Sequence, residues 1–263
     1  MPRALLACER AVLEELQRAA ALACFLDYDG TLAPIAPTPE EARPLPGTAA
    51  LVERLVRLRA TEVAIVSGRT VDDLRRCLDV PGVVYIGVHG LEWLRPGERL
   101  ERAAVASSVV EELPAIRRQL EVALGSRPGI RLEDKGLTLA VHYRLASRPD
   151  ARRAHETVER LVAACRARGV PLDVLRGHEV SEIRPAGANK GRAVVGLLAG
   201  RHPEPLALYI GDDRTDEEAF QSLPASAVTV RVGPPEVETA ARYRLGDPAA
   251  VQAFLRQLVE VRA

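Results

Sequence analysis

The chain has 263 residues, of which 47% are hydrophobic and 27% are charged, and its formal net charge is zero. This length allows one large domain or two moderate ones, each with a core of its own. The balanced charge offers no basic face for nucleic acid and no polybasic membrane anchor, and no apolar run approaches the roughly 20 residues that span a bilayer.

Strand-like and helical segments alternate over the first hundred residues and again after residue 187. Apolar, β-rich runs predict strands at residues 21–26, 62–68, 83–88, 206–213 and 227–232. The range 206–213 includes the loop that follows its strand. Apolar residues at helical spacing predict helices at residues 47–60, 71–78, 190–198, 215–223 and 248–261. This alternation is typical of an α/β fold, in which a doubly wound parallel sheet carries helices on both faces.

The middle of the chain breaks this alternation. Two amphipathic helices are expected there, at residues 111–124 and 151–168, and each is followed by a pair of short strands. The strands of each pair are joined by residues suited to hairpin turns, Lys135-Gly136 and Gly177-His178.

Such an αββ-αββ segment would form an antiparallel sheet separate from the parallel one. We therefore expect an inserted second domain that comprises residues 106–186. The first domain would then consist of residues 1–105 together with residues 187–263.

The first motif, FLDYDGT, places two aspartates directly after a predicted strand. Asp27 and Asp29 would lie at the C-terminal end of that strand, the edge of an open α/β sheet where ligands bind. Two carboxylates this close repel each other unless a cation or a shared proton intervenes. The stretch does not fit an EF-hand loop, because Gly30 comes too early in it. Two solvated aspartates in a turn remain the structural alternative.

Two further motifs are suited to an anion such as phosphate. Ser67-Gly68-Arg69 follows the next predicted strand, where a hydroxyl and backbone N–H groups can donate to a phosphate oxygen. Lys190 lies at the start of a predicted helix, so that its ammonium and the helix N-terminus both favour an anion. Neither motif is specific alone, because Ser-Gly is also an ordinary turn and the glycine spacing before Lys190 is not that of a P-loop.

The fourth motif, YIGDDRTDEEAF, is rich in acidic residues. Thr215 and Glu218 have the spacing of a capping box that would open the next helix. Asp212 and Asp213 precede that cap and are not explained by it. Since they follow an apolar strand, we expect them at the same sheet edge as Asp27.

Together the four motifs favour phosphoryl transfer. Carboxylates at a sheet edge bind Mg²⁺, which keeps several waters and takes one or two protein carboxylates plus phosphate oxygens. A hydroxyl and a lysine would hold the remaining phosphate oxygens. One aspartate could then act as a nucleophile and another as an acid and base.

The motifs D-x-D-G-T, strand-end Ser, helix-start Lys and G-D-D, in this order over the whole chain, resemble the haloacid dehalogenase (HAD) superfamily of phosphohydrolases. The resemblance implies a HAD-like, Rossmannoid core with Mg²⁺ as the cofactor. In that pattern Asp27 forms an aspartyl-phosphate, and Asp29 protonates the leaving oxygen and then activates water. The implied phosphate-binding residues are Ser67, Gly68, Arg69 and Lys190. The implied metal-binding residues are Asp27, Asp29 through its carbonyl, Asp212 and Asp213.

Finer features resemble the trehalose-6-phosphate phosphatases, which carry an inserted α/β cap. These features are SGR, GVHGLEW, EDK…HYR, EIRP…NKG and GDDRTDEEAF. The resemblance implies hydrolysis of trehalose 6-phosphate to trehalose and phosphate, the last step of trehalose biosynthesis. The residues that it implies for binding of the disaccharide are Glu133, Lys135, Arg144 and Glu182. His178 stands where many relatives have a lysine, and it would donate to a sugar hydroxyl.

The lysines support these positions. Of the 36 basic residues only two are lysines, Lys135 and Lys190, and both fall on implied site positions. A compact ammonium can fill a role that a planar guanidinium cannot, although chance survival of two lysines is the alternative.

Other functions remain open at this point. Another sugar phosphate, such as sucrose-6-phosphate, glucosylglycerol-phosphate or mannosyl-phosphoglycerate, could be the substrate. A phospho-accepting signalling receiver also pairs an aspartate with acidic Mg²⁺ ligands, but it should lack the inserted domain and the acid/base Asp29. An inactive sugar-phosphate sensor is a third possibility.

The N-terminus and the cysteines bear on localisation. Charged residues at helical spacing, among them Glu9, Arg10 and Glu14, make the N-terminal segment unlike a signal peptide. The four cysteines form neither a C-x-x-C pair nor a metal-like cluster. We expect a cytoplasmic, monomeric enzyme that binds a small-molecule sugar phosphate and neither nucleic acid nor membranes.

Overall fold

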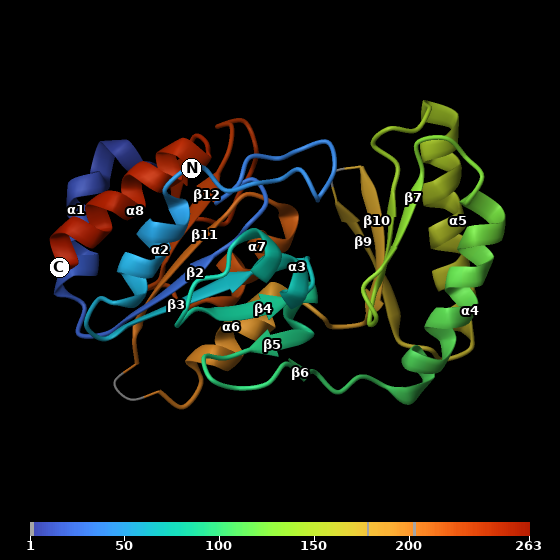
Figure 1. The fold of residues 1–263 in the computed structure, drawn as a ribbon, viewed down its shortest axis with the longest axis horizontal. Helices are drawn as coiled ribbons and strands as arrows, with labels where there is room; N and C mark the ends of the chain where they lie inside the picture. The colour runs from blue at the N-terminus through green and yellow to red at the C-terminus, as the bar shows by residue number, and fades with distance from the viewer. Residues whose placement is uncertain (1–2, 178, 202–203) are drawn as a thin grey trace. The chain divides into compact units, whose positions relative to one another are not determined.

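The computed structural model describes residues 3–177, 179–201 and 204–263 (Figure 1). The chain divides into two compact units. The core unit runs up to Arg102 and resumes at Asn189, and the inserted unit comprises Ala103–Ala188. Each unit has its own sheet and its own hydrophobic core.

The core unit is built on one mixed sheet. Among the described residues its nine strands follow the order β1-β13-β12-β11-β2-β3-β4-β5-β6. The strands from β1 to β4 in this order pair in parallel, whereas β5 and β6 add an antiparallel edge. The strands are β1 Arg3–Ala4, β2 Leu22–Leu26, β3 Thr61–Val66, β4 Val84–Gly87, β5 Glu92–Leu94, β6 Glu101–Arg102, β11 Leu206–Gly211, β12 Val228–Val232 and β13 Tyr243–Leu245.

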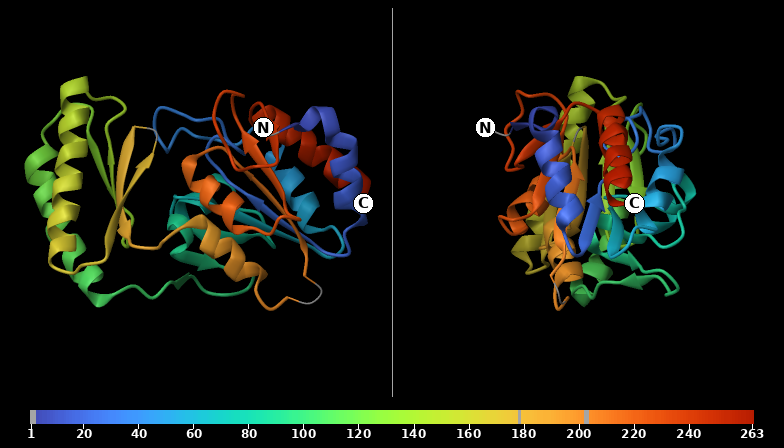
Figure 2. Two further views of the ribbon diagram at one scale, coloured as in Figure 1. Left: turned by 180° about the vertical axis from the view of Figure 1, so that it is seen from behind. Right: turned by 90° about the vertical axis from the view of Figure 1, so that its left-hand side faces the viewer.

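Helices cover both faces of this sheet (Figure 2). On one face, helices α1, α2, α3 and α8 bury a hydrophobic cluster that includes Leu55 and Phe254, and on the other, α6 and α7 bury Val194 and Phe220. The doubly wound α/β fold expected from the sequence is therefore confirmed. These helices are α1 Leu5–Arg18, α2 Thr48–Val56, α3 Val71–Cys77, α6 Lys190–Leu198, α7 Arg214–Ser222 and α8 Pro248–Arg262. None of the helices in the described ranges is both long and apolar enough to cross a bilayer.

Strand β2 lies between β11 and β3 in the sheet. Leu26, the last residue of β2, pairs with Ile210 of β11 and with Ile65 of β3. Since the three strands are parallel, their C-terminal ends lie side by side. The D-x-D, Ser-Gly-Arg and G-D-D motifs therefore begin at one edge of the sheet, as the sequence analysis expects.

The inserted unit has the expected αββ-αββ order and a four-stranded antiparallel sheet, β7-β8-β10-β9. Its two helices pack on one face of this sheet, where Ile116 and Ile183 are buried. Glu133 and Glu182 pair with Ala140 from opposite sides, so they share a face. Because Glu182 precedes Ile183 on its strand, that face points away from the helices. The elements are α4 Ser107–Leu124, β7 Arg131–Asp134, β8 Leu139–His142, α5 Arg148–Ala167, β9 Leu172–Gly177 and β10 Val180–Pro185.

Several ends of elements differ from those expected. Helix α4 begins at Ser107, four residues before the expected start. The sequence does not show this boundary, because the N-cap Ala106 has no side chain that could mark a helix start. Helix α2 ends at Val56, and Ala60 then adopts a left-handed backbone with φ of 49°. Strands β1, β5, β6 and β13 are not predicted from the sequence, since strands of two or three residues are too short to show an alternating pattern.

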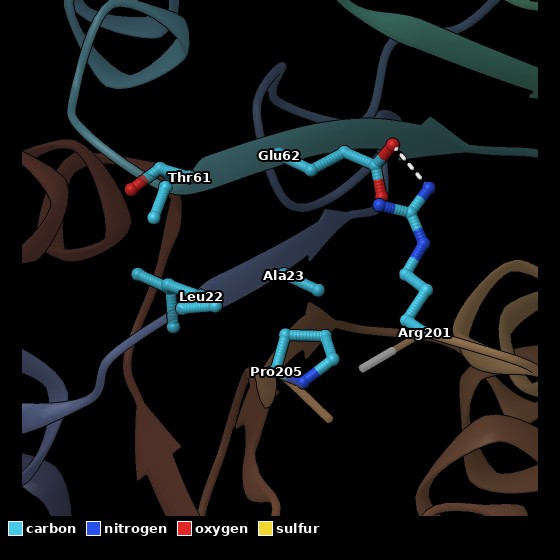
Figure 3. A pocket seen from close by; sticks show the side chains of 8 residues that line it. Leu22, Ala23, Thr61, Glu62, Arg201 and Pro205 are labelled. Carbon is cyan, nitrogen blue, oxygen red and sulfur yellow. Dashed lines mark hydrogen bonds and ion pairs between the residues drawn. The ribbon is translucent and has the colours of Figure 1, made fainter. Parts of the chain in front are cut away.

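A pocket of about 480 Å³ opens at the amino-terminal edge of the core sheet (Figure 3). It is lined by the first residues of β2 and β3 and by Pro205, which precedes β11. At its wall Arg201 Nη2 donates to Glu62 Oε1 at 2.7 Å. The acidic motifs follow these strands at their other ends, so this pocket is separate from them.

Candidate active site

Asp27 is the first residue after β2, and its side chain is buried. Its N–H donates to the carbonyl of Ile210 at 2.9 Å, which ties the start of this loop to β11. The chain then turns at Gly30, whose φ is +77°. A Cβ at Gly30 would lie 2.0 Å from Asp212 Oδ2. Glycine is therefore required at this position for the D-x-D-G-T and G-D-D loops to meet.

Lys190 joins the group from the start of α6. The helix begins there because Asn189 caps it, its side chain accepting from the Arg192 N–H at 2.7 Å. The Lys190 ammonium donates to Asp27 Oδ1 at 2.6 Å and to Asp216 Oδ1 at 2.8 Å. Burial disfavours the charged amine, but these two carboxylates outweigh it and raise the pKa of Lys190 above its ordinary value. Lys190 therefore stays an ammonium at the centre of the site.

Asp216 is a site residue that the sequence motifs do not reveal. It lies in the first turn of α7, is fully buried, and accepts three hydrogen bonds. The Tyr209 hydroxyl and the Lys190 ammonium donate to its Oδ1, and the Asp213 N–H donates to its Oδ2 at 2.9 Å. The capping box of α7 is thus formed by Asp213 and Asp216, and the assignment of the cap to Thr215 and Glu218 is wrong.

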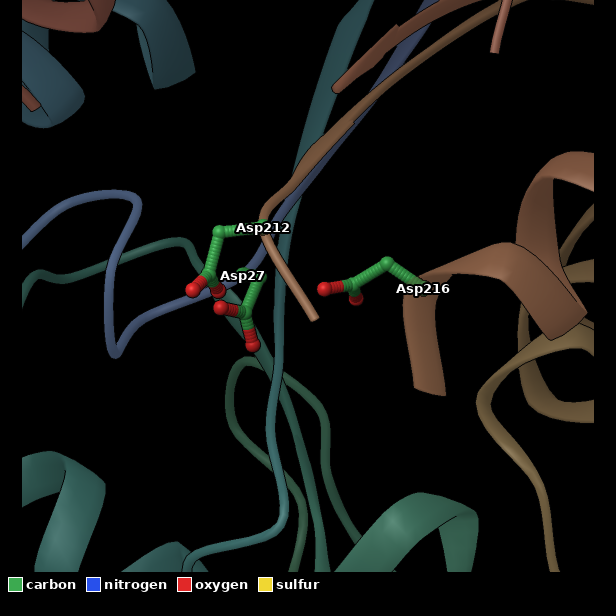
Figure 4. A group of neighbouring side chains, drawn as sticks. All are labelled: Asp27, Asp212 and Asp216. Carbon is green, nitrogen blue, oxygen red and sulfur yellow. The ribbon is translucent and has the colours of Figure 1, made fainter. Parts of the chain in front are cut away.

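Asp27, Asp212 and Asp216 form a compact carboxylate group (Figure 4). One oxygen from each lies within 4.8 Å of the others. Burial raises the pKa of Asp27 well above its usual range, although the Lys190 charge opposes this. Burial, with the charges of Asp216 and Asp213, raises the pKa of Asp212 to about 7. A further cation beside such crowded, buried acids would favour their anionic forms.

The donor set fits a magnesium ion. Asp212 Oδ1 is buried and, among the described residues, has no hydrogen-bond partner. Asp27 and Asp212 would thus supply the one or two carboxylates that Mg²⁺ usually takes from a protein. Asp216 already accepts three hydrogen bonds, which suits it to holding Lys190 rather than a metal. Asp213, which the sequence analysis also considers as a ligand, is the N-cap of α7.

The Ser67-Gly68-Arg69 loop follows β3, next to the loop of Asp27. Ser67 is buried, its Oγ accepts from the Arg69 N–H at 3.2 Å, and its own N–H donates to Ile86. A Cβ at Gly68 would lie 2.6 Å from the ring of His89, so the loop leaves no space for a side chain there. The Ser67 hydroxyl is thereby fixed at the sheet edge that carries the carboxylates.

Arg69 and Asp29 form a bidentate ion pair. Arg69 Nε donates to Asp29 Oδ2 and Nη2 donates to Oδ1, both at 2.7 Å. Nη2 also donates to the carbonyl of Pro39, and the guanidinium lies 5.1 Å from the centre of the Tyr28 ring. Although burial opposes the charge, hydrogen bonding to Asp29 raises the pKa of Arg69. The structure therefore places Arg69, a predicted phosphate ligand, against the predicted acid/base.

In the inserted unit, Lys135 and Glu182 meet on the open face of the sheet. Lys135 Nζ donates to Glu182 Oε2 at 3.1 Å, and the Thr138 hydroxyl donates to Glu182 Oε1 at 2.6 Å. Both charged side chains are at least nine-tenths buried. A buried ammonium and carboxylate of this kind can exchange partners with the hydroxyls of a sugar.

Glu133 lies on the same face, where its Oε2 is 2.7 Å from His142 Nε2. Burial raises the pKa of Glu133, but the His142 hydrogen bond and the charge of Lys135 outweigh this effect and lower it overall. Arg144 pairs with Glu179, with its Nε 3.4 Å from Oε2. His178 lies outside the described residues.

A protein-family model for trehalose-phosphatase matches residues 25–249, which include every one of these motifs. This chain belongs to the trehalose-phosphatase family. The membership that the sequence motifs predict is therefore confirmed.

Individual relatives of the family agree with this. A trehalose-phosphate phosphatase of Mycobacterium marinum is 36% identical over 249 residues, which cover 90% of this chain and 61% of the relative. The chain thus spans about three-fifths of that relative's length. The structure of this chain is similar to that of the C-terminal domain of a trehalose-6-phosphate phosphatase from C. albicans, with a TM-score of 0.88, 24% identity and full coverage of both chains. At 24% identity this likeness concerns the fold alone.

The predicted HAD-like fold is confirmed as well. A subclass IIB sugar phosphatase of the HAD superfamily matches with a TM-score of 0.56 and 14% identity, and the match covers 90% of this chain and 98% of that one. At this level of identity the likeness concerns the fold alone. This chain thus shares its architecture with a sugar phosphatase of the HAD superfamily.

Proposed function

We propose that this chain is a Mg²⁺-dependent phosphatase that hydrolyses trehalose 6-phosphate to trehalose and phosphate, the last step of trehalose biosynthesis. The main support is the contact of the Lys190 ammonium with Asp27, 2.6 Å apart, in a buried group that also holds Asp212. This arrangement presents one carboxylate, one fixed cation and a site for a divalent cation to a single phosphate group. Family membership and the names of its relatives support trehalose 6-phosphate as the ester.

In the proposed reaction Asp27 is the nucleophile. One of its carboxylate oxygens forms a bond to phosphorus while the bond from phosphorus to the sugar oxygen breaks, which gives an aspartyl-phosphate. The Ser67 hydroxyl and the Lys190 ammonium donate to the phosphoryl oxygens and hold them in line for this displacement. A magnesium ion held by Asp27 and Asp212 would neutralise charge on the phosphoryl group.

Asp29 is proposed as the acid and base. Its carboxyl gives a proton to the departing sugar oxygen and later takes one from the water that attacks the aspartyl-phosphate, which restores both residues. Since Arg69 holds Asp29 by two hydrogen bonds in the structure, we propose that the bound phosphate ester draws Arg69 away and releases the carboxyl. Arg69 would then contact phosphate, as the sequence analysis expects.

The inserted unit is proposed to recognise the sugar. Lys135, Glu182 and Glu133 share one face of its sheet, and each can donate to or accept from a sugar hydroxyl. Arg144 and His178 are kept as further proposed contacts. A sugar that replaces the Lys135 to Glu182 bond would leave no buried charge without a partner.

A phosphate-release panel tests the proposal. Trehalose 6-phosphate, sucrose-6-phosphate, glucosylglycerol-phosphate, mannosyl-phosphoglycerate and p-nitrophenyl phosphate would each be supplied with Mg²⁺ and, separately, with excess chelator. Trehalose 6-phosphate should give the highest kcat/KM, and chelator should abolish release. A higher kcat/KM for another sugar phosphate would change the proposed substrate, and release in chelator would exclude the metal-dependent reaction.

A further inference from the structure

Tyr209 lies on β11 with its hydroxyl directed at the carboxylate group. Its ring is fully buried, stacks on Phe25 at a centroid distance of 6.2 Å, and meets Phe220 edge-on at 5.5 Å. The hydroxyl donates to Asp216 Oδ1 at 2.7 Å. Two aromatic contacts thus fix the ring, so that the hydroxyl has one orientation relative to Asp216.

The hydroxyl can act there only as a donor. Burial and the nearby charge of Asp216 raise the pKa of Tyr209 well above its ordinary value, so the phenol keeps its proton. Asp216 Oδ1 receives this hydrogen bond and that of Lys190, while Oδ2 receives the N–H of Asp213. With one donor on Oδ2 and a rigid donor on Oδ1, the Asp216 carboxylate has no freedom to rotate.

We propose that Tyr209 is a positioning residue, which fixes Asp216 so that Asp216 holds the Lys190 ammonium against Asp27. The inference rests on the proposed function, because it assigns the hydroxyl to a chain of hydrogen bonds that ends at the proposed nucleophile. The links of this chain measure 2.7, 2.8 and 2.6 Å, and all four side chains are buried. If the hydroxyl is removed, Asp216 can rotate and the ammonium can leave Asp27.

Tyr209→Phe removes only the hydroxyl and keeps the aromatic contacts. We expect kcat to fall roughly 10- to 100-fold, because a hydrogen bond to a charged group is lost. The fall should be equal for trehalose 6-phosphate and p-nitrophenyl phosphate, since Lys190 acts on the phosphate that both carry. The matched control is Tyr85→Phe, because Tyr85 is also buried but bonds to the backbone of Val80 and Leu78. That variant should lose stability and keep kcat.

A second readout does not depend on turnover. Lys135 and Lys190 are the only lysines in the sequence, so a protein labelled with ¹⁵N-lysine gives two ammonium signals. Lys135→Arg assigns them. Tyr209→Phe should shift the Lys190 signal and speed its hydrogen exchange at least about tenfold, because a looser ammonium meets water more often. The Lys135 signal should stay unchanged.

The outcomes separate this inference from the proposed function. An unchanged Lys190 signal in Tyr209→Phe would overturn the positioning role, whatever the effect on kcat. A wild-type protein without activity on any phosphate ester would overturn the proposed function and leave the spectroscopic test in place. If Tyr209→Phe does not fold, the wild-type spectrum still decides, since a Lys190 ammonium that exchanges as fast as an exposed lysine contradicts the arrangement.

Discussion

The guanidinium of Arg69 donates two parallel hydrogen bonds of 2.7 Å each to the carboxylate of Asp29. The arginine side chain is only 10% exposed, whereas that of the aspartate is 41% exposed, so the pair is anchored on the arginine. The proposed acid/base Asp29, which lies in the loop after β2, is therefore held by a residue of the loop after β3.

Arg69→Lys should lower kcat about tenfold or more on every phosphate ester, because a compact ammonium cannot form two parallel hydrogen bonds with the phosphate that Arg69 is proposed to contact when it leaves Asp29. The melting temperature should also fall, since the mostly buried Arg69 loses its hydrogen bond to Pro39 and its contact with the Tyr28 ring. Arg75→Lys is the control, because Arg75 of α3 makes a similar two-bond contact with Asp79, and both side chains are exposed. Equal losses of kcat in the two variants would contradict the role given to Arg69.

Asp27→Asn should reduce phosphate release to below about a hundredth of that of the wild type, since an amide is a poor nucleophile. An acid whose pKa is raised by folding destabilises the folded state at a pH above its unfolded pKa. The neutral amide should therefore leave the melting temperature of the metal-free protein equal or higher. Steady-state assays and calorimetry measure both effects. Residual turnover similar to that of the exposed Asp72→Asn control would rule out Asp27 as the nucleophile.

Metal affinity should depend on pH through Asp212. Because its pKa is raised to about 7, protons compete with Mg²⁺ below that pH, and the half-saturating Mg²⁺ concentration should rise as the pH falls from 7. Asp212→Ala should raise this concentration at least about tenfold and weaken its pH dependence. Titration of Mg²⁺ by calorimetry in the absence of substrate avoids turnover. Full activity in excess chelator would show that the carboxylates serve another purpose.

Chemistry and recognition should separate by substrate. Lys190→Ala should slow trehalose 6-phosphate and p-nitrophenyl phosphate alike, because both present a phosphate to Lys190. Lys135→Ala and Glu182→Ala should lower kcat/KM for trehalose 6-phosphate roughly 30- to 1000-fold, which corresponds to an activation free energy higher by about 2 to 4 kcal/mol. Neither variant should change kcat/KM for the aryl phosphate.

The exposed Arg160→Ala on α5 is the control for the inserted unit, and it should change neither substrate. Equal losses on both substrates in Lys135→Ala would assign Lys135 to stability or to chemistry. No loss on either would leave the charges of this face without a role in binding.

The sequence predicts correctly which residues lie at the C-terminal edge of the core sheet, because each strand and the motif after it are visible within a short stretch of sequence. Asp27, Ser67 and Asp212 each follow a short apolar run, and the parallel pairing of three neighbouring strands then brings them together. The lysine signal is also local, since Lys190 follows a capping Asn189. These residues could therefore be assigned to one site without coordinates.

The sequence does not reveal the interactions within that site. Asp216 stands three residues after Asp213, the spacing of a capping box, but Thr215 and Glu218 have the same spacing and mask the signal. The pairing of Arg69 with Asp29 joins residues 40 apart and depends on side-chain conformation. Tyr209 looks like any apolar strand residue until its hydroxyl is seen against Asp216.

The absent side chain of Gly30 has a consequence for how this site can be altered. A single methyl group there would occupy the space of the Asp212 carboxylate, although the two residues lie in opposite halves of the chain. A variant library that randomises the first loop alone would thus perturb the acidic loop without touching its sequence. Efforts to alter the specificity of the proposed site must vary both loops jointly, since each limits the conformations open to the other.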